Sequence, residues 1–294
     1  MSNWELNEID QQLIDLALRE DLDIVFCDLT TQCLFSDRSY SGKATLVSKH
    51  TTPIVLCGLP IINELLARFE TEYTINTSYQ DGDVIAAQHQ ILTVASSAAI
   101  LLMAERTLLN FLRHLSAIAT LTKAFVDKVK HTQLKILDTR KTTPGLRHLE
   151  KYAVHCGGGV NHRLGLYDAY IIKDTHVDLL GGMQQALAKL PEKTVNRLPV
   201  IVEVRNTKEL QAVIDHGQGK VDRVLLDNMS VKQMRECVHR CNNIFSTEAS
   251  GNLNLDNIVA VAESGVDFAS IGMLTHSAGN VDISMQILQN RESQ

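Results

Sequence analysis

The segment between Asp138 and His176 is rich in side chains that bind anions. It contains six lysines and arginines and only four carboxylates, although the whole chain has a formal net charge of −6 at pH 7. Guanidinium groups pair with carboxylate or phosphate oxygens through two parallel hydrogen bonds, and a lysine supplies a compact positive charge. The segment therefore predicts a site for an anionic substrate. Its positive residues are Arg140, Lys141, Arg147, Lys151, Arg163 and Lys173.

Three consecutive glycines, at positions 157 to 159, lie shortly before His162 and Arg163. Such a run allows the backbone to lie close to a ligand, although a tight connection between elements explains it equally well. A histidine buried next to an arginine would be costly without a nearby anion. The pair after the glycines therefore favours ligand binding.

Lys173 follows the apolar run Tyr170–Ile172, and a lysine there has two interpretations. It could form a Schiff base with a carbonyl substrate, as in aldolases, which requires a lowered pKa. Asp174 opposes that shift because a negative neighbour stabilises the charged amine. The sequence therefore favours a charge pair between Lys173 and a substrate carboxylate.

Two carboxylates, Glu203 and Asp227, follow successive apolar runs. They could bind sugar hydroxyls or a divalent cation, because Mg²⁺ prefers carboxylates together with substrate phosphates and water. The alternative is a structural salt bridge to Arg205 or Arg223.

Small polar residues follow the last two apolar runs: Ser250–Gly251 in one case and the loop Gly272–Ser277, which contains His276, in the other. Loops at this position bind phosphate in α/β barrels. Asn252 is expected to cap a helix that begins near Leu255 and thereby to direct free backbone amides toward an anion.

The elements that must position these groups are short apolar runs that recur after Lys130 at intervals of roughly 20 to 35 residues, each followed by a helical stretch. Polar or ionisable residues follow every run. In an α/β barrel the carboxyl ends of the strands meet at the active site, so this pattern predicts an α/β barrel with one site. The expected strands are Lys135–Leu137, Tyr170–Ile172, Val200–Val202, Val224–Leu226, Ile244–Phe245 and Phe268–Ile271.

The first third of the chain has a different pattern, which predicts an α+β domain. An amphipathic first helix is expected to end near Arg19, followed by a polar loop at Asp28–Thr31. The alternating run Ala44–Val47 predicts a strand, and Asp81–Asp83 a turn between two more strands. From about residue 97 to residue 128 the pattern is helical.

Glu105 and Arg106 are the only charged residues between Ser97 and Leu112. A charged pair in so apolar a helix is either an exposed stripe or part of a site. Composition does not choose between these interpretations.

The bulk composition limits the classes of function. A length of 294 residues with 45% hydrophobic content suits two globular domains. The negative net charge argues against general nucleic-acid binding, which needs clustered lysine and arginine. The uncharged stretch Ile91–Met103 is too short to span a bilayer and is expected to be a buried helix. The acidic start suggests no export signal, so we expect a cytoplasmic protein without membrane contact.

The six cysteines include no CxxC motif and are expected to be reduced. Cys237 and Cys241, with His239 between them, could suggest a zinc site. Their spacing of four residues suits two small side chains packed on one helix face, which we favour because a zinc site needs further ligands.

Together, several stretches of the chain resemble the quinolinate phosphoribosyltransferase family, also called carboxylating nicotinate-nucleotide pyrophosphorylases. The stretches occur in the family's order, and the resemblance extends from about Leu16 to Ile287. They are Ala104–Leu112, Asp138–Arg147, Gly157–Asp168, Ile172–Asp174, Leu225–Asn228, Glu248–Gly251 and Leu274–Ser277.

The resemblance implies an α/β protein with an N-terminal α+β, sandwich-like domain at residues 1–115 and a C-terminal open, incomplete α/β barrel at residues 116–276. The tail at about 277–294 is expected to pack back on the first domain. The implied molecule is a homodimer with shared active sites.

The implied reaction joins quinolinate to phosphoribosyl pyrophosphate (PRPP), with Mg²⁺, and gives nicotinate mononucleotide, pyrophosphate and CO₂ in de novo NAD biosynthesis. Residues matching the family's quinolinate site are Arg140, Lys141, His162, Arg163 and Lys173, with Arg106 from the partner subunit. Glu203 and Asp227 match its ribose and magnesium carboxylates and, with Lys141, are the expected catalytic groups. The residues that match its phosphate loops are Ser250, Gly251, Gly272 and His276.

The sequence also departs from the family pattern. Ile201 stands where relatives often have a further glutamate, Thr175 where asparagine is usual, and Asn252 where a second glycine is common. The stretch Asp23–Cys27 replaces a short glycine link. These departures bear on affinity and loop geometry, whereas the cationic set is complete.

Two alternatives remain beside this interpretation. A molybdenum-transport-associated branch of the same fold shares part of the signature, but Lys173 followed by Asp174 argues against it. A catalytically silent anion-binding protein would be expected to lose some of the cations or Glu203 and Asp227, and all are present.

Overall fold

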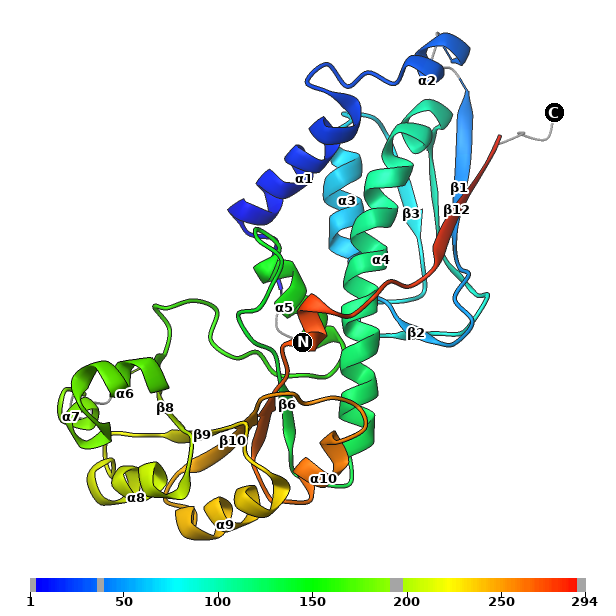
Figure 1. Ribbon diagram of the computed structural model, residues 1–294. Coiled ribbons are helices and arrows are strands. Elements are labelled where there is room, and N and C mark those ends of the chain that lie inside the picture. Colours follow the sequence, from blue (N-terminus) through cyan, green and yellow to red (C-terminus); the bar gives the residue numbers. More distant parts are fainter. Residues whose placement is uncertain (1–3, 36–39, 191–197, 290–294) are drawn as a thin grey trace. The chain divides into compact units, whose positions relative to one another are not determined.

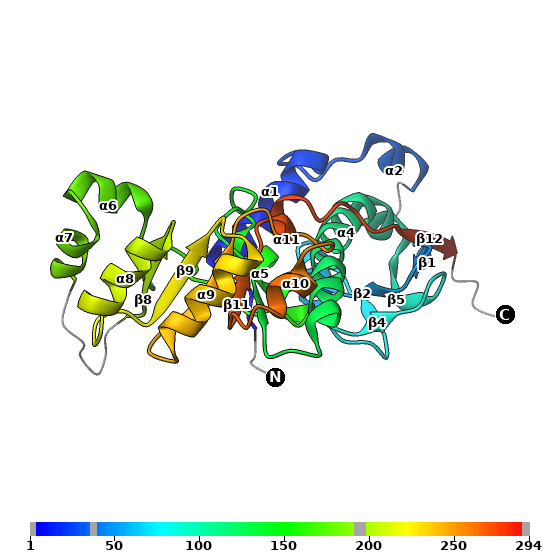
Figure 2. The same ribbon diagram turned by 60° about the horizontal axis from the view of Figure 1, so that its bottom comes forward.

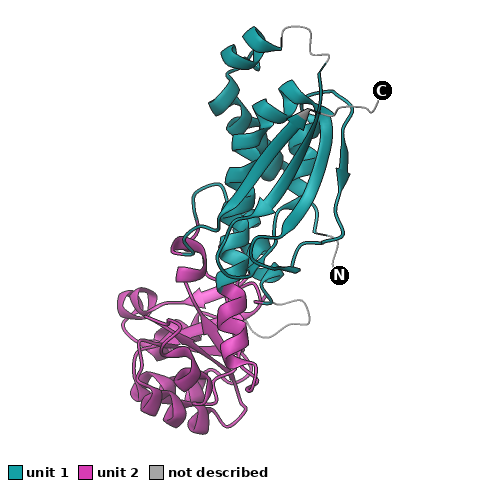
Figure 3. Ribbon diagram, turned by 90° about the vertical axis from the view of Figure 1, so that its right-hand side faces the viewer, with its two compact units in different colours: residues 1–121, 143–158, 278–294 teal, residues 122–142, 159–277 magenta. Residues whose placement is uncertain are grey.

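The computed structural model describes residues 4–35, 40–190 and 198–289, and the chain divides into two compact units (Figure 3). Unit 1 comprises residues 1–121, 143–158 and 278–294, and unit 2 comprises residues 122–142 and 159–277. The segment 143–158 thus belongs to unit 1, although the sequence suggested a continuous second domain from 116 to 276.

A four-stranded sheet forms the centre of unit 1, with the order β12-β1-β5-β3 (Figure 1). Buried and exposed residues alternate along β1, as expected for a strand with one face on a core. All strand pairs of this sheet are antiparallel, and β12 pairs with β1 from Gly42 to Ser48. The strands are β1 (Ser41–Ser48), β3 (Thr74–Asn76), β5 (Gln90–Ser97) and β12 (Ile283–Gln289), and a separate pair consists of β2 (Ile54–Val55) and β4 (Val84–Ile85).

The first helix, α1 (Glu8–Leu22), starts at a capping box in which Asn7 and Asp10 exchange side-chain and backbone hydrogen bonds. It buries Ile14, Leu18 and Leu22 and so continues one turn beyond the expected end near Arg19. The other helices wholly within unit 1 are α2 (Leu29–Leu34), α3 (Leu59–Ala67) and α5 (Arg147–Cys156).

The expected polar loop at Asp28–Thr31 is wrong, because α2 begins at Leu29. The Asp28 carboxylate accepts hydrogen bonds from the backbone N–H groups of Thr30 and Thr31 and from the Thr31 hydroxyl. These bonds lower the pKa of Asp28, the Thr31 hydroxyl having the largest effect. The polar residues that suggested a loop are therefore the cap of a helix.

The long helix α4 (Ala98–Val129) contains the boundary between the units. The interpretation of Ile91–Met103 as one buried helix is wrong, because its first residues belong to β5 and α4 starts only at Ala98. Within the described ranges, none of the helices combines the length and apolarity that crossing a membrane requires.

Unit 2 contains a parallel sheet with the order β6-β11-β10-β9-β8-β7, which confirms the α/β class. In the described part of the chain no pairing joins β6 to β7, so the sheet is open. The strands are β6 (Lys135–Leu137), β7 (Tyr170–Ile172), β8 (Val200–Val204), β9 (Arg223–Asp227), β10 (Ser246–Ser250) and β11 (Phe268–Ser270).

The fifth strand differs from its expected position. Ile244 is exposed and lies before β10, and the strand consists of the largely polar residues Ser246–Ser250. Its central residues are nevertheless buried, and they include Glu248. The strand was misplaced because its inward carboxylate looks like a loop residue in the sequence.

Helices alternate with these strands, and α8 and α9 lie side by side along the sheet (Figures 1 and 2). Cys237 and Cys241 are both buried on α9, and the Cys237 thiol contacts the Met229 sulfur at 3.6 Å, in agreement with a packing role. The helices are α6 (Asp174–Leu180), α7 (Met183–Ala188), α8 (Thr207–His216), α9 (Val231–Cys241), α10 (Ile258–Ala262) and α11 (Met273–His276).

Candidate active site

A cavity of about 900 Å³ lies in unit 2, next to the carboxyl ends of the parallel strands. It brings together every predicted site residue except Arg106. The predicted residues that line it are Arg140, Lys141, His162, Arg163, Lys173, Glu203, Asp227, Ser250, Gly251, Gly272 and His276.

Strand periodicity explains why the carboxylates face this cavity. Glu203 is half-buried between the fully buried Val202 and Val204, so it points to the opposite face of β8. Parallel register places Glu203 and Glu248 on either side of Leu225. Polar side chains of β8, β9 and β10 therefore lie on the same face of the sheet.

A buried carboxylate holds the loop that carries the cationic pair His162 and Arg163. Asp138, at the end of β6, accepts hydrogen bonds from the Asn161 side-chain amide at 2.6 Å and from the His162 backbone N–H at 2.8 Å. The loop after the three glycines is therefore fixed to the strand that leads to Arg140 and Lys141.

The guanidinium of Arg163 lies in a setting that disfavours its charge. Burial lowers the pKa of Arg163, and the positive charge of Arg140 lowers it further, while Asp168 partly offsets both effects. Arg163 donates one hydrogen bond to the Ala169 carbonyl at 2.9 Å. An anion bound beside the two guanidinium groups would remove their repulsion.

His162 is oriented by both of its ring nitrogens. Nδ1 accepts a hydrogen bond from the Arg163 backbone N–H at 2.7 Å, so the ring proton lies on Nε2 in the neutral form. Nε2 is 3.3 Å from Oε1 of Glu248, and only 9% of the His162 side chain is exposed. The ring is held in one tautomer.

Glu248 is a buried carboxylate that the sequence did not single out as a site residue. Burial raises its pKa, but hydrogen bonds and charges from His162 and Arg223 outweigh burial and lower the pKa overall. Arg223 pairs with Glu248 at 2.9 Å and lies 3.7 Å from the centroid of the Phe268 ring. The signal available in the sequence was the alternation of Ser246, Glu248 and Ser250.

Glu203 and Asp227 form an interacting pair of carboxylates. Burial raises the pKa of Glu203, and the negative charge of Asp227 raises it further. Asp227 accepts hydrogen bonds from the Ser250 hydroxyl at 2.8 Å and the Asn228 amide at 2.9 Å.

The structural alternative for these carboxylates was a salt bridge to a neighbouring arginine. Among the described ion pairs, Arg205 binds Asp178 and Glu209, and Arg223 binds Glu248. Glu203 and Asp227 therefore remain directed at the cavity.

Two glycines allow close packing around the cavity. Gly251 has φ +92°, and a Cβ there would lie 2.2 Å from the Asn228 side-chain oxygen. A Cβ on Gly272 would lie 3.0 Å from the Lys141 side chain and 3.2 Å from His276 Nε2. Larger residues at either position would displace a group that lines the site.

The expected cap at Asn252 is wrong. Asn252 has φ 52°, and its amide donates to the Asn228 side-chain oxygen at 3.3 Å. The following helix, α10, begins only at Ile258, with Asn257 before it. The side chain of Asn252 is therefore used to join two loops.

Two protein-family descriptions match this chain: the N-terminal domain of quinolinate phosphoribosyl transferase over residues 28–116 and the C-terminal domain over residues 118–286. The chain belongs to the quinolinate phosphoribosyltransferase family. Both matches lie within the range expected from the motifs.

Relatives of the quinolinate phosphoribosyltransferase family match nearly the whole chain. A probable nicotinate-nucleotide pyrophosphorylase (carboxylating) of Bacillus subtilis (strain 168) is 37% identical over 271 residues, which are 92% of this chain and 91% of that protein. The corresponding protein of Mycobacterium leprae (strain TN) is 43% identical over 73% of this chain and 75% of its own length. The solved nicotinate-nucleotide pyrophosphorylase of Francisella tularensis superposes with a TM-score of 0.88 at 36% identity and covers 97% of this chain and 98% of its own.

Arg106, which the family resemblance assigns to a partner's site, lies in unit 1 on an exposed stripe of α4 with Leu102 and Asn110. Of the two interpretations left open for this charge, the exposed stripe holds within the chain. Arg106 lines a separate cavity of about 340 Å³ in unit 1, together with Asn110 and His114. Its role across a subunit interface stays a prediction.

Two departures from the family pattern lie close to the site. Ile201 is buried and shares a strand face with Glu203, so an apolar side chain lies next to Glu203 along that face. Thr175 is exposed in the first turn of α6, where its backbone N–H donates to Asp174.

Proposed function

We propose that this chain transfers the phosphoribosyl group of PRPP to quinolinate, with decarboxylation, and releases nicotinate mononucleotide, pyrophosphate and CO₂. The observation that carries the proposal is a single cavity in which four cationic side chains and His162 lie together with the three carboxylates of Glu203, Asp227 and Glu248. The names of the curated relatives support the same activity. A dianionic pyridine and a polyanionic donor repel each other in water, and preorganised cations offset that repulsion.

Quinolinate would be held by its two carboxylates. Arg140 and Arg163 offer paired N–H donors, while Lys141 and Lys173 offer point charges. His162 lines the same cavity, and its ring is held in place by the Arg163 backbone N–H and by Glu248. A dicarboxylate fits this set better than a monocarboxylate because its two negative charges can pair with more of these cations.

PRPP would occupy the opposite part of the site. Glu203 and Asp227 are suited to the ribose, where positive charge develops as pyrophosphate leaves. Lys141 is suited to an anionic group of either substrate. Loops at the last strands of an α/β barrel bind phosphate, and Ser250, Gly251, Gly272 and His276 line the cavity there.

The acidic pair also fits Mg²⁺. Mg²⁺ takes hard oxygen ligands, and both carboxylates supply such oxygens. Burial and then Asp227 raise the pKa of Glu203, so a nearby cation would favour the ionised form of the pair. When bound with the donor, Mg²⁺ supplies charge neutralisation for the departing pyrophosphate.

Decarboxylation needs no dedicated base in this proposal. Attack by the quinolinate ring nitrogen on the ribose carbon breaks the bond to pyrophosphate and makes a pyridinium. The positively charged ring nitrogen stabilises the electron pair that stays on the neighbouring ring carbon when its carboxylate departs as CO₂, and that carbon then takes up a proton that comes ultimately from solvent. The contribution of the protein is to orient both substrates and to exclude water.

The homodimer with shared sites and a cytoplasmic location are further parts of the proposal. Neither a nucleic-acid nor a membrane role is part of it.

The deciding assay combines quinolinate, PRPP and Mg²⁺ and follows nicotinate mononucleotide, with nicotinate as the control substrate. Equal turnover of nicotinate, or no turnover of quinolinate by folded protein, would contradict the proposal.

A further inference from the structure

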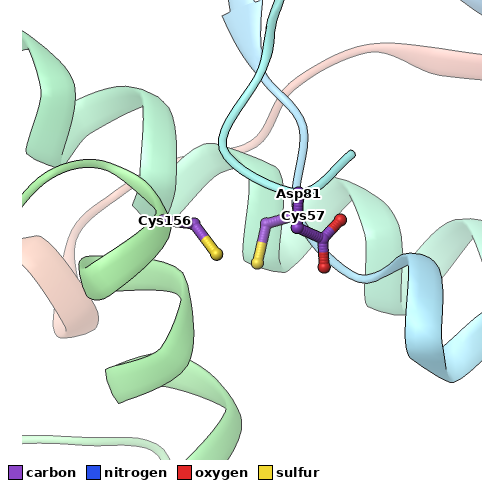
Figure 4. A group of neighbouring side chains, drawn as sticks. All are labelled: Cys57, Asp81 and Cys156. Carbon is purple, nitrogen blue, oxygen red and sulfur yellow. The ribbon is translucent and has the colours of Figure 1, made fainter. Parts of the chain in front are cut away.

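Three side chains of unit 1 that take no part in the proposed reaction, Cys57, Asp81 and Cys156, lie together. Their sulfur and carboxylate ligand atoms are all within 4.8 Å of one another. Figure 4 shows them reaching one place from three different segments of the chain. The segments are the residues before α3, the turn before β4 and the last residue of α5.

Cys57 is fixed by its own backbone. Its N–H donates to the Ser116 hydroxyl at 3.0 Å, and that hydroxyl donates to the Cys57 carbonyl at 3.3 Å. The residue is fully buried, whereas Cys156 is partly exposed. The Cys156 side of the cluster is therefore the side nearer to solvent.

Three neutral donors orient the Asp81 carboxylate. Oδ2 accepts from the Gly58 N–H at 3.0 Å and the Tyr152 hydroxyl at 2.8 Å, and Oδ1 accepts from the Leu59 N–H at 3.1 Å. Each carboxylate oxygen can accept two bonds, so Oδ1 keeps one direction for a further ligand. Its position is preorganised.

We propose that Cys57, Cys156 and Asp81 bind a thiophilic divalent cation of the zinc class, with water as the fourth ligand. Two sulfurs and one carboxylate oxygen are ligands that Zn²⁺ accepts in tetrahedral geometry. The cation replaces the two thiol protons, so two protons are released for each cation bound. The site is independent of the proposed function.

Both cation binding and oxidation of the cluster require the thiols to lose their protons. Burial raises the pKa of the Cys57 thiol well above its ordinary value, and Cys156 and Asp81 raise it further. A protonated thiol attacks oxidants slowly and binds a cation only when it loses its proton, because the thiolate is both the nucleophile and the ligand. A cation stabilises both thiolates and the carboxylate at once.

The cation has a structural consequence within unit 1. It would join the end of α5, in segment 143–158, to the residues before α3 and to the turn at Asp81. Segment 143–158 is connected to the rest of unit 1 in sequence only through residues of unit 2. The site would therefore fasten an inserted segment.

The test is a titration of the reduced protein with Cd²⁺ in the presence of a phosphine reductant, followed by calorimetry and by sulfur-to-metal charge-transfer absorbance. We expect one saturable site and proton release close to two per cation, with affinity that rises with pH. Cys156→Ser and Cys57→Ala should each weaken binding by about 100-fold or more, beyond the losses typical of outer-shell partners. Asp81→Asn should weaken it by about 10-fold.

The matched control is Cys33→Ser, which removes an exposed thiol on α2 and should leave the titration unchanged. Absence of saturable Cd²⁺ binding, or binding that survives Cys156→Ser, would overturn the proposal. It would also be overturned if the reduced protein takes no Cd²⁺ but peroxide links Cys57 to Cys156. If Cys57→Ala does not fold, the Cys156→Ser variant decides, since its site is partly exposed at a helix end.

Discussion

At the level of single residues, the role proposed for Glu203 makes activity depend on its ionisation. Burial and then Asp227 raise its pKa above the ordinary value of a glutamate. A carboxylate that must be ionised to act is active above its pKa and loses activity as pH falls through it. We therefore expect kcat/KM to decline on the acid side at a higher pH than an unperturbed glutamate would give.

The same coupling can be measured directly. Asp227→Asn removes the negative neighbour, so the pKa of Glu203 should fall, and a ¹³C carboxyl titration would detect the change. An unchanged Glu203 titration in this variant would show that the two carboxylates do not interact.

Glu203→Gln should lose Mg²⁺-dependent turnover and keep quinolinate binding in calorimetry.

A second residue-level prediction concerns Lys173. Lys173→Ala or Arg140→Ala should lower kcat/KM for quinolinate by roughly 10-fold to more than 100-fold, because a charged hydrogen bond contributes about 1.5 to 3 kcal/mol. Circular dichroism should show an intact fold. Lys232→Ala, on the exposed side of α9, is the control and should be neutral.

Wild-type kcat/KM in folded Lys173→Ala would remove this lysine from the quinolinate site. Borohydride trapping with substrate tests the Schiff-base alternative separately. No covalent adduct is expected, since charge pairing and not imine formation is the proposed role of Lys173.

Most residues around the cavity could be predicted from the sequence, because side chains after parallel strands converge whatever the details of the loops. Glu248 could not be assigned in the same way. Its pairing with His162 and Arg223 depends on which strands are neighbours, and a single sequence does not give that order. The exposure of Arg106 was likewise hidden, because an apolar helix has one face that only packing identifies.

At the level of elements, the loop after β10 depends on glycine. Gly251→Ala should reduce both stability and activity, because φ +92° is strained for alanine and the new Cβ would meet the Asn228 side chain. Asn228 donates to Asp227, so its displacement would disturb the acidic pair. Chemical denaturation and kcat/KM measure the two effects.

Gly219→Ala separates the effect of backbone strain from the effect of the contact with Asn228. Gly219 also has a positive φ, of +75°, but a Cβ there meets nothing within 4 Å. It should cost about 1 to 2 kcal/mol of stability through the backbone alone and leave kcat/KM unchanged. Equal activity losses in both variants would mean that the contact with Asn228 is unimportant.

Element prediction succeeded where one physical signal dominated. The strands before the cavity are short apolar runs, and five of the six expected ones coincide with observed strands or differ from them by at most two residues at an end. It failed at β10, whose polar residues are buried by pairing with both neighbours, and at α2, which buries only Thr31. Neither case has an apolar periodicity to detect.

For the whole molecule, the proposed dimer makes a quantitative prediction. If Arg106 completes the partner's site, and if Arg106→Ala and Lys173→Ala are each close to inactive, their mixed dimers will contain one intact and one doubly altered site. With random exchange, about half of the dimers are mixed, so total activity should return to about a quarter of wild type, as two-fold symmetry requires.

A site built within one chain gives another result. Every site then keeps one substitution, and activity stays near zero after complete exchange. Mass spectrometry should verify the heterodimers. Verified heterodimers without recovered activity would rule out the shared site and leave Arg106 with a role in the cavity of unit 1 that it lines.

The return of the chain to unit 1 affects the order in which the protein can be completed on the ribosome. β1 lies between β5 and β12, and β12 consists of residues 283–289. During synthesis β5 follows soon after β1, but the other edge of β1 stays unpaired until the strands of unit 2 have been translated. An open edge of this length can pair with another nascent chain. The unit whose synthesis begins first is therefore the last to close.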